Sequence, residues 1–249
     1  MESHPYPRGF LFQTKVSLRI AFIGRLFNSP VNKNIPALLA TLLIASGFIF
    51  AADPAFKVEI DYSTAPACEA FATKSKALVE EWYPKINEVL FDKNHPLPVA
   101  TVRLKFEPMK GVAHATGDGI HISEDWVTKK APNDYGMVVH ELTHVVQHYG
   151  GKGEGWLTEG IADYIRHKYF EKDIEKIRPN PDKSSYNQAY TTAAAFLFWL
   201  EQHKDKEIVR KLNLASNDGT YSRELFTKYC GADVDALWKE FTDSLRVAK

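Results

Sequence analysis

A short run of the chain combines three side chains that could bind and use a metal ion. His140-Glu141-Leu142-Thr143-His144 has the form H-E-x-x-H, a spacing suited to metal-dependent hydrolysis. An α-helix turns about 100° per residue, so His140 and His144 would lie on one face with their ring nitrogens directed at one ion. Catalytic zinc takes three protein ligands and keeps one open position. The motif therefore predicts a Zn²⁺ site in which Glu141 is the general base for a zinc-activated water.

Two histidines leave one zinc ligand to be found, and a carboxylate is expected to supply it. Glu159 follows a short glycine-rich connection and lies on the next predicted helix, which can fold back against the first. Asp163 comes one helical turn later, where its carboxylate could accept the second ring N–H of a zinc-bound histidine and fix its tautomer. We expect Glu159 to be the third ligand and Asp163 to support a histidine. The reverse assignment, with Asp163 as ligand, remains open.

Other zinc-site arrangements are excluded by spacing. His148 continues the i, i+4 series, but a helix rises ~1.5 Å per residue, which places it about 12 Å along the axis from His140. A shared zinc would need bonds of about 2.1 Å. The three-histidine pattern H-E-x-x-H-x-x-G-x-x-H also fails, because Gln147 and Gly150 stand where its glycine and last histidine should be. No methionine follows Met137, so the Met-turn of that class is missing too.

A peptidase also needs a group that stabilises negative charge on the substrate oxygen in the transition state. Four residues of the C-terminal half have suitable side chains: Arg166, His167, Tyr186 and Tyr190. Aromatic residues at helical spacing more often pack in a core, and the sequence singles out none of the four for this role.

The segments that must position these residues are predicted from the period of their apolar residues, which is two in strands and 3.6 in helices. Strands are expected over residues 56–62, 99–106, 111–115 and 117–122. Helices are expected over residues 65–91, 133–149, 156–170, 190–203, 206–214, 221–228 and 234–247. This order predicts an α+β fold: a small N-terminal mixed sheet with a long helix, a zincin-type active-site helix and a helical C-terminal half.

Residues 1–52 are expected to be a leader that precedes a single domain over residues 53–249. The run 35–52, IPALLATLLIASGFIFAA, is apolar, follows Arg25 and Lys33 and ends in small residues, as a secretory signal peptide does. We therefore expect a secreted or periplasmic protein with no stable membrane association after cleavage. A membrane span usually needs about 20 apolar residues, so an uncleaved N-terminal anchor is the less favoured alternative.

The composition indicates a globular domain and gives no sign of a nucleic-acid partner. Of the 31 basic and 31 acidic side chains, residues 1–52 hold five and one, so the domain carries 26 and 30, a formal net charge of −4. A mildly acidic domain without a basic stripe lacks the charge distribution of a nucleic-acid-binding protein. We expect a monomer. Cys68 and Cys230 could form a disulfide in an exported protein, or remain two free thiols.

Several motifs, in order along the chain, resemble the plant and bacterial basic secretory proteins, a group regarded as zinc peptidases. The matching segments are GVAHATGDGIHIS (111–123), HELTHVVQ (140–147), GWLTEGIADYIRHK (155–168), AYTTAAAFLFWLE (189–201) and LWKEF (237–241). The resemblance extends from about Val58 to Leu245. Because it rests on several ordered motifs, it is more specific than H-E-x-x-H alone.

The resemblance implies a secreted, thermolysin-like (gluzincin-type) metallopeptidase domain, in a family associated in plants with defence. The family's zinc motif falls on His140, Glu141 and His144, and its E-G-I-A-D-Y element falls on Glu159–Tyr164. Two further matches are Gln147 and Arg166. The net charge of −4 departs from the basic character that the family name implies. The spacer between the histidines and the E-G-I-A-D-Y element is also shorter than in thermolysin-like enzymes.

These observations favour one function and leave two alternatives. We expect a secreted zinc peptidase that hydrolyses peptide bonds of a peptide or protein substrate. One alternative is a secreted binding or defence protein that keeps the zincin fold without catalysis, although an intact Glu141 argues against it. The other is a zinc amidase acting on cell-wall peptides, which differs only in substrate. The predicted sheet could pair with an extended peptide along its edge, or it could only cover the core.

Overall fold

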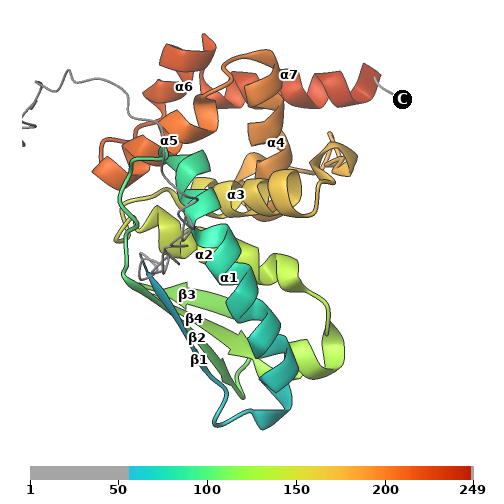
Figure 1. The fold of residues 1–249 in the computed structure, drawn as a ribbon. Coiled ribbons are helices and arrows are strands. Elements are labelled where there is room, and N and C mark those ends of the chain that lie inside the picture. Colours follow the sequence, from blue (N-terminus) through green and yellow to red (C-terminus); the bar gives the residue numbers. More distant parts are fainter. Residues whose placement is uncertain (1–55, 248–249) are drawn as a thin grey trace, which may run out of the picture. The chain divides into compact units, whose positions relative to one another are not determined.

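The mixed sheet expected at the start of the domain is present in the computed structural model, which describes residues 56–247 (Figure 1). Its strands are β1 (Lys57–Asp61), β2 (Thr101–Glu107), β3 (Ala113–Thr116) and β4 (Gly119–Ser123), in the order β1-β2-β4-β3. β1 and β4 each pair with β2 in parallel, and β3 pairs antiparallel with β4. The predicted α+β class is confirmed, and β3 lies at an edge of the sheet.

One face of the sheet packs on helices because its side chains alternate. Val102, Leu104 and Phe106 of β2 are buried, whereas Arg103 between them is exposed. The long helix α1 (Glu69–Leu90), preceded by one 3₁₀ turn, covers the buried face together with α2 (Tyr135–Gln147). Fully burying such an apolar side chain contributes roughly 1.5–3 kcal/mol. The sheet and α1 therefore form a firm base for the helix that carries H-E-x-x-H.

Helix α2 (Tyr135–Gln147) carries the H-E-x-x-H motif and has a defined start and end. It begins at Asp134, whose carboxylate accepts a hydrogen bond from the Met137 backbone N–H at 3.1 Å. The helix predicted over residues 133–149 would continue up to the glycine pair 150–151, so the prediction places its end two residues too far along the chain. The helix ends instead at His148, which adopts a left-handed conformation with φ 45°. His148 is exposed, and the two glycines continue the turn toward α3.

Helix α3 (Gly155–Ile165) runs on into one wider π-helical turn, Arg166–Phe170, so the helix predicted over 156–170 is present with an altered last turn. Helix α4 (Tyr190–His203) packs against it at very short range. A Cβ on Gly160 would lie 2.7 Å from the Cβ of Ala193, so only glycine permits this approach. Tyr164 also donates a hydrogen bond to Glu201 of α4 at 2.7 Å. The two helices therefore behave as one rigid pair.

Three further helices complete the C-terminal half: α5 (Ile208–Asp218), α6 (Glu224–Cys230) and α7 (Val234–Val247). In Figure 1 they gather with α4 at the end of the domain away from the sheet, and α2 and α3 lie between the two groups. Phe196 of α4 and Trp238 of α7 meet edge to face, with ring centroids 5.3 Å apart. This aromatic contact anchors α7 on the rigid α3–α4 pair.

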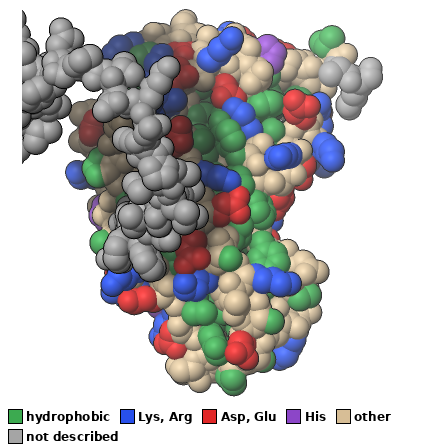
Figure 2. All heavy atoms as spheres, viewed as in Figure 1, with side chains coloured by type: hydrophobic (Ala, Val, Ile, Leu, Met, Phe, Trp, Pro, Cys, Tyr) green, Lys and Arg blue, Asp and Glu red, His purple; other side chains and the backbone are tan. Residues whose placement is uncertain are grey.

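Both cysteines are free thiols, Cys68 buried before α1 and Cys230 partly buried at the end of α6. On the face seen in Figure 2, Lys and Arg side chains alternate with Asp and Glu and form no basic stripe. None of the helices between residues 56 and 247 is both long and apolar enough to span a membrane. The predicted leader, residues 1–52, lies outside the described residues.

Candidate metal centre

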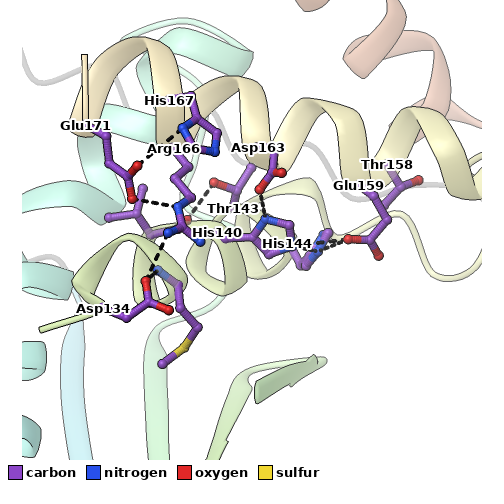
Figure 3. A network of polar contacts seen from close by, with 12 residues as sticks. Asp134, His140, Thr143, His144, Thr158, Glu159, Asp163, Arg166, His167 and Glu171 are labelled. Carbon is purple, nitrogen blue, oxygen red and sulfur yellow. Dashed lines mark hydrogen bonds and ion pairs between the residues drawn. The ribbon is translucent and has the colours of Figure 1, made fainter. Parts of the chain in front are cut away.

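Three side chains from two helices converge on one point between α2 and α3 (Figure 3). The Nε2 atoms of His140 and His144 are 3.2 Å apart, and their rings stand at 85° to each other. A carboxylate oxygen of Glu159, on α3, lies 3.1 Å from Nε2 of His140 and 3.4 Å from Nε2 of His144. The helix spacing of the two histidines and the fold-back of α3 together produce this arrangement.

The spacing of these three atoms suits a tetrahedral metal ion. Zinc bonds of ~2.0–2.1 Å at tetrahedral angles place any two ligand atoms about 3.3–3.4 Å apart. The three distances between the histidine nitrogens and the Glu159 oxygen are 3.1, 3.2 and 3.4 Å. His140, His144 and Glu159 could therefore hold a metal ion. A fourth position would face the cleft beside Glu141.

The outer nitrogen of His140 is held by Asp163. Nδ1 of His140 donates a hydrogen bond to Oδ1 of Asp163 at 2.7 Å, and both side chains are buried. With the Nδ1 proton committed to Asp163, Nε2 is the atom of His140 that faces Glu159. The Asp163 carboxylate thus contacts the ring on the side away from the point of convergence, whereas Glu159 contacts it on the near side.

The outer nitrogen of His144 is held by Gln147, which the sequence marked only as a family match. Nδ1 of His144 lies 2.7 Å from the Gln147 side-chain oxygen. The amide of Gln147 in turn donates to the backbone carbonyl of Thr158 at 3.0 Å, which fixes which end of the amide faces the histidine. Gln147 therefore orients His144 and ties α2 to α3 beside Glu159. An i, i+3 glutamine after the second histidine is the sequence signal that could have revealed this role.

The charges at the centre favour a cation at the point of convergence. Burial opposes protonation of His140, but the hydrogen bonds to Asp163 and Glu159 outweigh it and raise its pKa to about 9. Burial would likewise raise the pKa of Glu159, yet the hydrogen bonds from His140 and His144 lower it to about 2. A proton on Nε2 of His140 can form a hydrogen bond to Glu159, but it leaves Nε2 of His144 without a bond to the same point. A metal ion bonded to all three atoms would replace that proton.

Glu141 lies next to the three converging residues, but its carboxylate is not one of the groups that converge. Its side chain faces the same cleft and only 8% of the residue is exposed. Burial raises the pKa of its carboxyl above the ordinary value, and the nearby histidines partly offset the shift. A carboxylate with a raised pKa, close to His140, His144 and Glu159, is chemically suited to take up and return a proton.

A cleft of about 900 Å³ gives access to the centre. One side is formed by residues 112–115, which include most of the edge strand β3. The other side is formed by α3 and by the glycine-rich connection after α2. His140, Glu141 and His144 line the cleft between these two sides. A chain entering it would therefore run between the edge strand β3 on one side and α2 and α3 on the other.

The four residues considered for charge stabilisation lie in different places. Tyr186 is buried and its hydroxyl donates to Asp235 at 2.7 Å. His167 pairs with Asp173 at 2.8 Å and does not line the cleft. Arg166 lines the cleft, but Asp134 and Glu171 both bind its guanidinium, at 3.0 and 2.7 Å. Tyr190 lines the cleft and is 54% exposed.

Tyr190 reaches the cleft from the first residue of α4. Its ring lies over the ring of His140, with centroids 6.1 Å apart and planes 22° from parallel. The negative charge of Glu159, together with partial burial, raises the pKa of Tyr190 above its ordinary value. The hydroxyl therefore stays protonated near neutral pH and can act as a hydrogen-bond donor.

A second group of possible metal ligands lies near the first but differs from it. His167, Glu171 and Asp173 bring ligand atoms close together. One ring nitrogen of His167 contacts both carboxylates, at 3.3 and 2.8 Å, and Arg166 holds the other oxygen of Glu171. Arg166 and His167 already occupy these carboxylates. This network joins the π-helical turn to the start of α2 through Arg166 and Asp134.

Comparison with known proteins adds a family assignment to this geometry. A family model described as "Peptidase of plants and bacteria" matches residues 53–241. No curated protein and no solved structure shows significant similarity to the chain. The matched range contains the sheet, the three converging residues and the cleft.

Proposed function

Because the chain belongs to this family of peptidases of plants and bacteria, we propose that it is a zinc-dependent peptidase with its active centre at His140, His144 and Glu159. Family membership confirms the resemblance to the basic secretory proteins. The observation that carries the proposal is the convergence of two histidine nitrogens and one carboxylate oxygen within 3.4 Å of one another, beside a buried glutamate.

Zinc suits this set of ligand atoms better than other common ions. Two imidazole nitrogens and one carboxylate oxygen at tetrahedral spacing match its catalytic sites, whereas Ca²⁺ and Mg²⁺ prefer six or more oxygen ligands. When bound, zinc would supply a Lewis acid that polarises the scissile carbonyl and lowers the pKa of water toward ~7. Asp163 and Gln147 would fix the histidine tautomers and so keep the inner nitrogens available for the metal.

Glu141 is proposed as the general base. It would take a proton from the attacking water as the new C–O bond forms, and later deliver that proton to the amide nitrogen as the C–N bond breaks. Its raised pKa supports both steps, because a carboxyl with an ordinary pKa would release a proton readily but hold it poorly. Its position on the cleft, one residue from His140, places it beside the open coordination site.

The substrate is proposed to be a peptide bound in extended form along β3. This strand pairs only with β4 among the described strands, so its outer edge is free to form main-chain hydrogen bonds. The cleft runs between that edge and the metal-binding helices. If the β3–β4 hairpin only covered the core, its outer edge would have no reason to line the cleft. We also propose that residues 1–52 direct export, which the apolar run 35–52 supports.

The test of this proposal compares wild-type protein with Glu141→Gln at equal zinc content, on casein and on a broad peptide library. We expect about one zinc per chain in both proteins and turnover only in the wild type. Glu175→Gln, which changes an exposed glutamate outside the cleft, is the matched control and should retain activity. If zinc-loaded wild type and Glu141→Gln are equally inert, a binding protein on a zincin fold is supported instead. Cleavage of muropeptides in place of casein would support the amidase.

A further inference from the structure

The two residues at the start of α4 have an unusual backbone conformation. Ala189 has φ 59° and ψ −160°, and Tyr190 has φ 49°. The conformation of Ala189 belongs to a region that is essentially restricted to glycine, and a positive φ is also uncommon for a bulky residue such as tyrosine. Neither residue is glycine, so the local chain conformation is strained. Strain of this kind persists only where the surrounding structure fixes it, and it clusters at functional sites.

Hydrogen bonds on both sides hold Ala189 in this conformation. Its backbone N–H donates to the carbonyl of Tyr186 at 3.0 Å, and its carbonyl accepts from the N–H of Ala193 at 3.2 Å. Before it, Ser185 and Gln188 form a reciprocal capping box around the 3₁₀ turn. The strained dipeptide therefore joins a closed turn to the first turn of α4, and neither side can relax without losing hydrogen bonds.

This backbone conformation directs the Tyr190 side chain into the cleft. That side chain is 54% exposed, yet it lines the same cleft as Glu141 and lies over the ring of His140. Within the described part of the chain, its hydroxyl makes no hydrogen bond to another residue. The close approach of Gly160 to Ala193 fixes α4 against α3 within one turn of both Tyr190 and Glu159. The distance between the tyrosine and the metal centre is thus set by two tightly packed helices.

We propose that Tyr190 is a catalytic residue whose hydroxyl donates a hydrogen bond to the substrate oxygen as that oxygen gains negative charge. As water attacks, the carbonyl π electrons move onto this oxygen and Glu141 takes the water's proton. When the carbonyl reforms, the C–N bond breaks and the proton on Glu141 moves to the nitrogen. The Tyr190 hydroxyl keeps its own proton throughout. This inference rests on the proposed peptidase function and adds the group that stabilises its transition state.

Of the four residues considered from the sequence, Tyr190 is the one that lines the cleft without being bound by a carboxylate. The hydroxyl of Tyr186 and the guanidinium of Arg166 are bound by Asp235 and by Asp134 with Glu171, respectively. A purely structural reading of Tyr190 is that its ring covers His140. Phenylalanine would do that equally well, so the substitution Tyr190→Phe separates the two readings.

The experiment measures steady-state kinetics and inhibitor binding of zinc-loaded wild type, Tyr190→Phe and Tyr62→Phe. Tyr62 follows β1, does not line the cleft and serves as the matched loss of a phenolic hydroxyl. Removing one donor of this kind lowers kcat by about 10²–10³-fold in other hydrolases. We expect a fall of about 100-fold in kcat with little change in KM for Tyr190→Phe and no change for Tyr62→Phe. A phosphinic pseudopeptide, whose tetrahedral oxygens imitate the transition state, should bind Tyr190→Phe at least 10-fold more weakly than the wild type by calorimetry.

The outcomes distinguish this inference from the proposed function. If wild type cleaves peptides and Tyr190→Phe cleaves them equally well, Tyr190 only covers His140 and the inference is overturned. Equal affinity of wild type and Tyr190→Phe for the phosphinic peptide overturns it as well, and that measurement does not depend on turnover. If wild type itself is inert and does not bind the pseudopeptide, the proposed function and this inference fail together.

Discussion

Asp163 accepts a hydrogen bond from Nδ1 of His140 at 2.7 Å, and the two residues are only 5% and 8% exposed. The contact joins α3 to α2 at the side of the imidazole that faces away from Glu159. Because the Nδ1 proton is directed at a carboxylate, the inner Nε2 is the nitrogen left for a metal ion. The position of α3 therefore decides which nitrogen of His140, on α2, is left to bind a metal ion.

Replacing Asp163 with asparagine should weaken zinc binding without unfolding the protein. The amide keeps an acceptor for Nδ1 but removes the negative charge that makes the ring a better ligand. Changes of this kind typically cost 10–100-fold in metal affinity. Competition with a chromophoric chelator would measure the loss. Asp173→Asn changes the similar pair with His167, at 2.8 Å, and should leave zinc affinity unchanged. Equal effects of the two substitutions would contradict the role given to Asp163.

The metal-free protein should lose stability as the pH rises. The folded-state pKa of His140, about 9, lies above its ordinary value of 6.5. Protonated His140 therefore contributes stability that is complete below about pH 6.5 and is lost as the pH rises through about 9. The loss should not exceed roughly 3 kcal/mol. Urea unfolding in the presence of a chelator, from pH 6 to 9.5, measures it. His140→Gln should flatten the profile, and a profile of equal slope in that variant would show that another group is responsible.

Substituting Ala189 with glycine should stabilise the fold while impairing turnover. Relief of strain of about 1–3 kcal/mol outweighs the entropic cost of glycine, which is about 0.5–1 kcal/mol. The expected net gain is about 1 kcal/mol, or ~2–4 °C in Tm. Kcat should fall because the added backbone freedom loosens Tyr190. Ala236→Gly, at an exposed position inside α7, is the control and should cost about 1 kcal/mol. A comparable loss of stability in Ala189→Gly would show that the φ of Ala189 carries no strain.

Gly160→Ala should destabilise the protein through the α3–α4 contact. The new Cβ would lie 2.7 Å from that of Ala193, so the helices must separate. Overpacking of this kind costs about 1–3 kcal/mol. The same substitution at Gly155, where no atom lies within 4 Å of the added carbon, should be neutral or slightly stabilising. Urea unfolding of both variants makes the comparison. A neutral result at Gly160 would mean that α4 moves freely against α3.

Helices and strands that follow from the local period of apolar residues could be predicted from the sequence. They include α2 and α3, which carry His140, His144 and Glu159. The predicted helices 190–203 and 234–247 match α4 and α7 residue for residue. The shared helix face of His140 and His144 follows from helix geometry alone. Glu159 could be considered for the centre because a short connection forces α3 to fold back beside α2.

The features that the sequence did not reveal depend on contacts between distant segments or on rare backbone states. A glycine pair is the usual helix stop, yet His148 adopts the left-handed conformation and ends α2 before it. The orientation of His144 by Gln147 needs the carbonyl of Thr158, which only the packed structure brings near. The strained conformation of Ala189 could not be predicted, because alanine normally avoids it. Only the structure therefore separates Tyr190 from the other three candidates.

The proposed peptidase activity requires a zinc ion held at His140, His144 and Glu159, and adding zinc back to metal-free protein tests this requirement directly. Peptide hydrolysis would be followed while zinc is titrated into chelator-treated wild type, with Glu159→Gln as a parallel sample. We predict that activity is absent at the start, rises in proportion to added zinc and levels off at one equivalent. Glu159→Gln should need far more zinc. Full hydrolysis by the metal-free protein, or an identical titration of both proteins, would show that the activity does not depend on zinc held by Glu159.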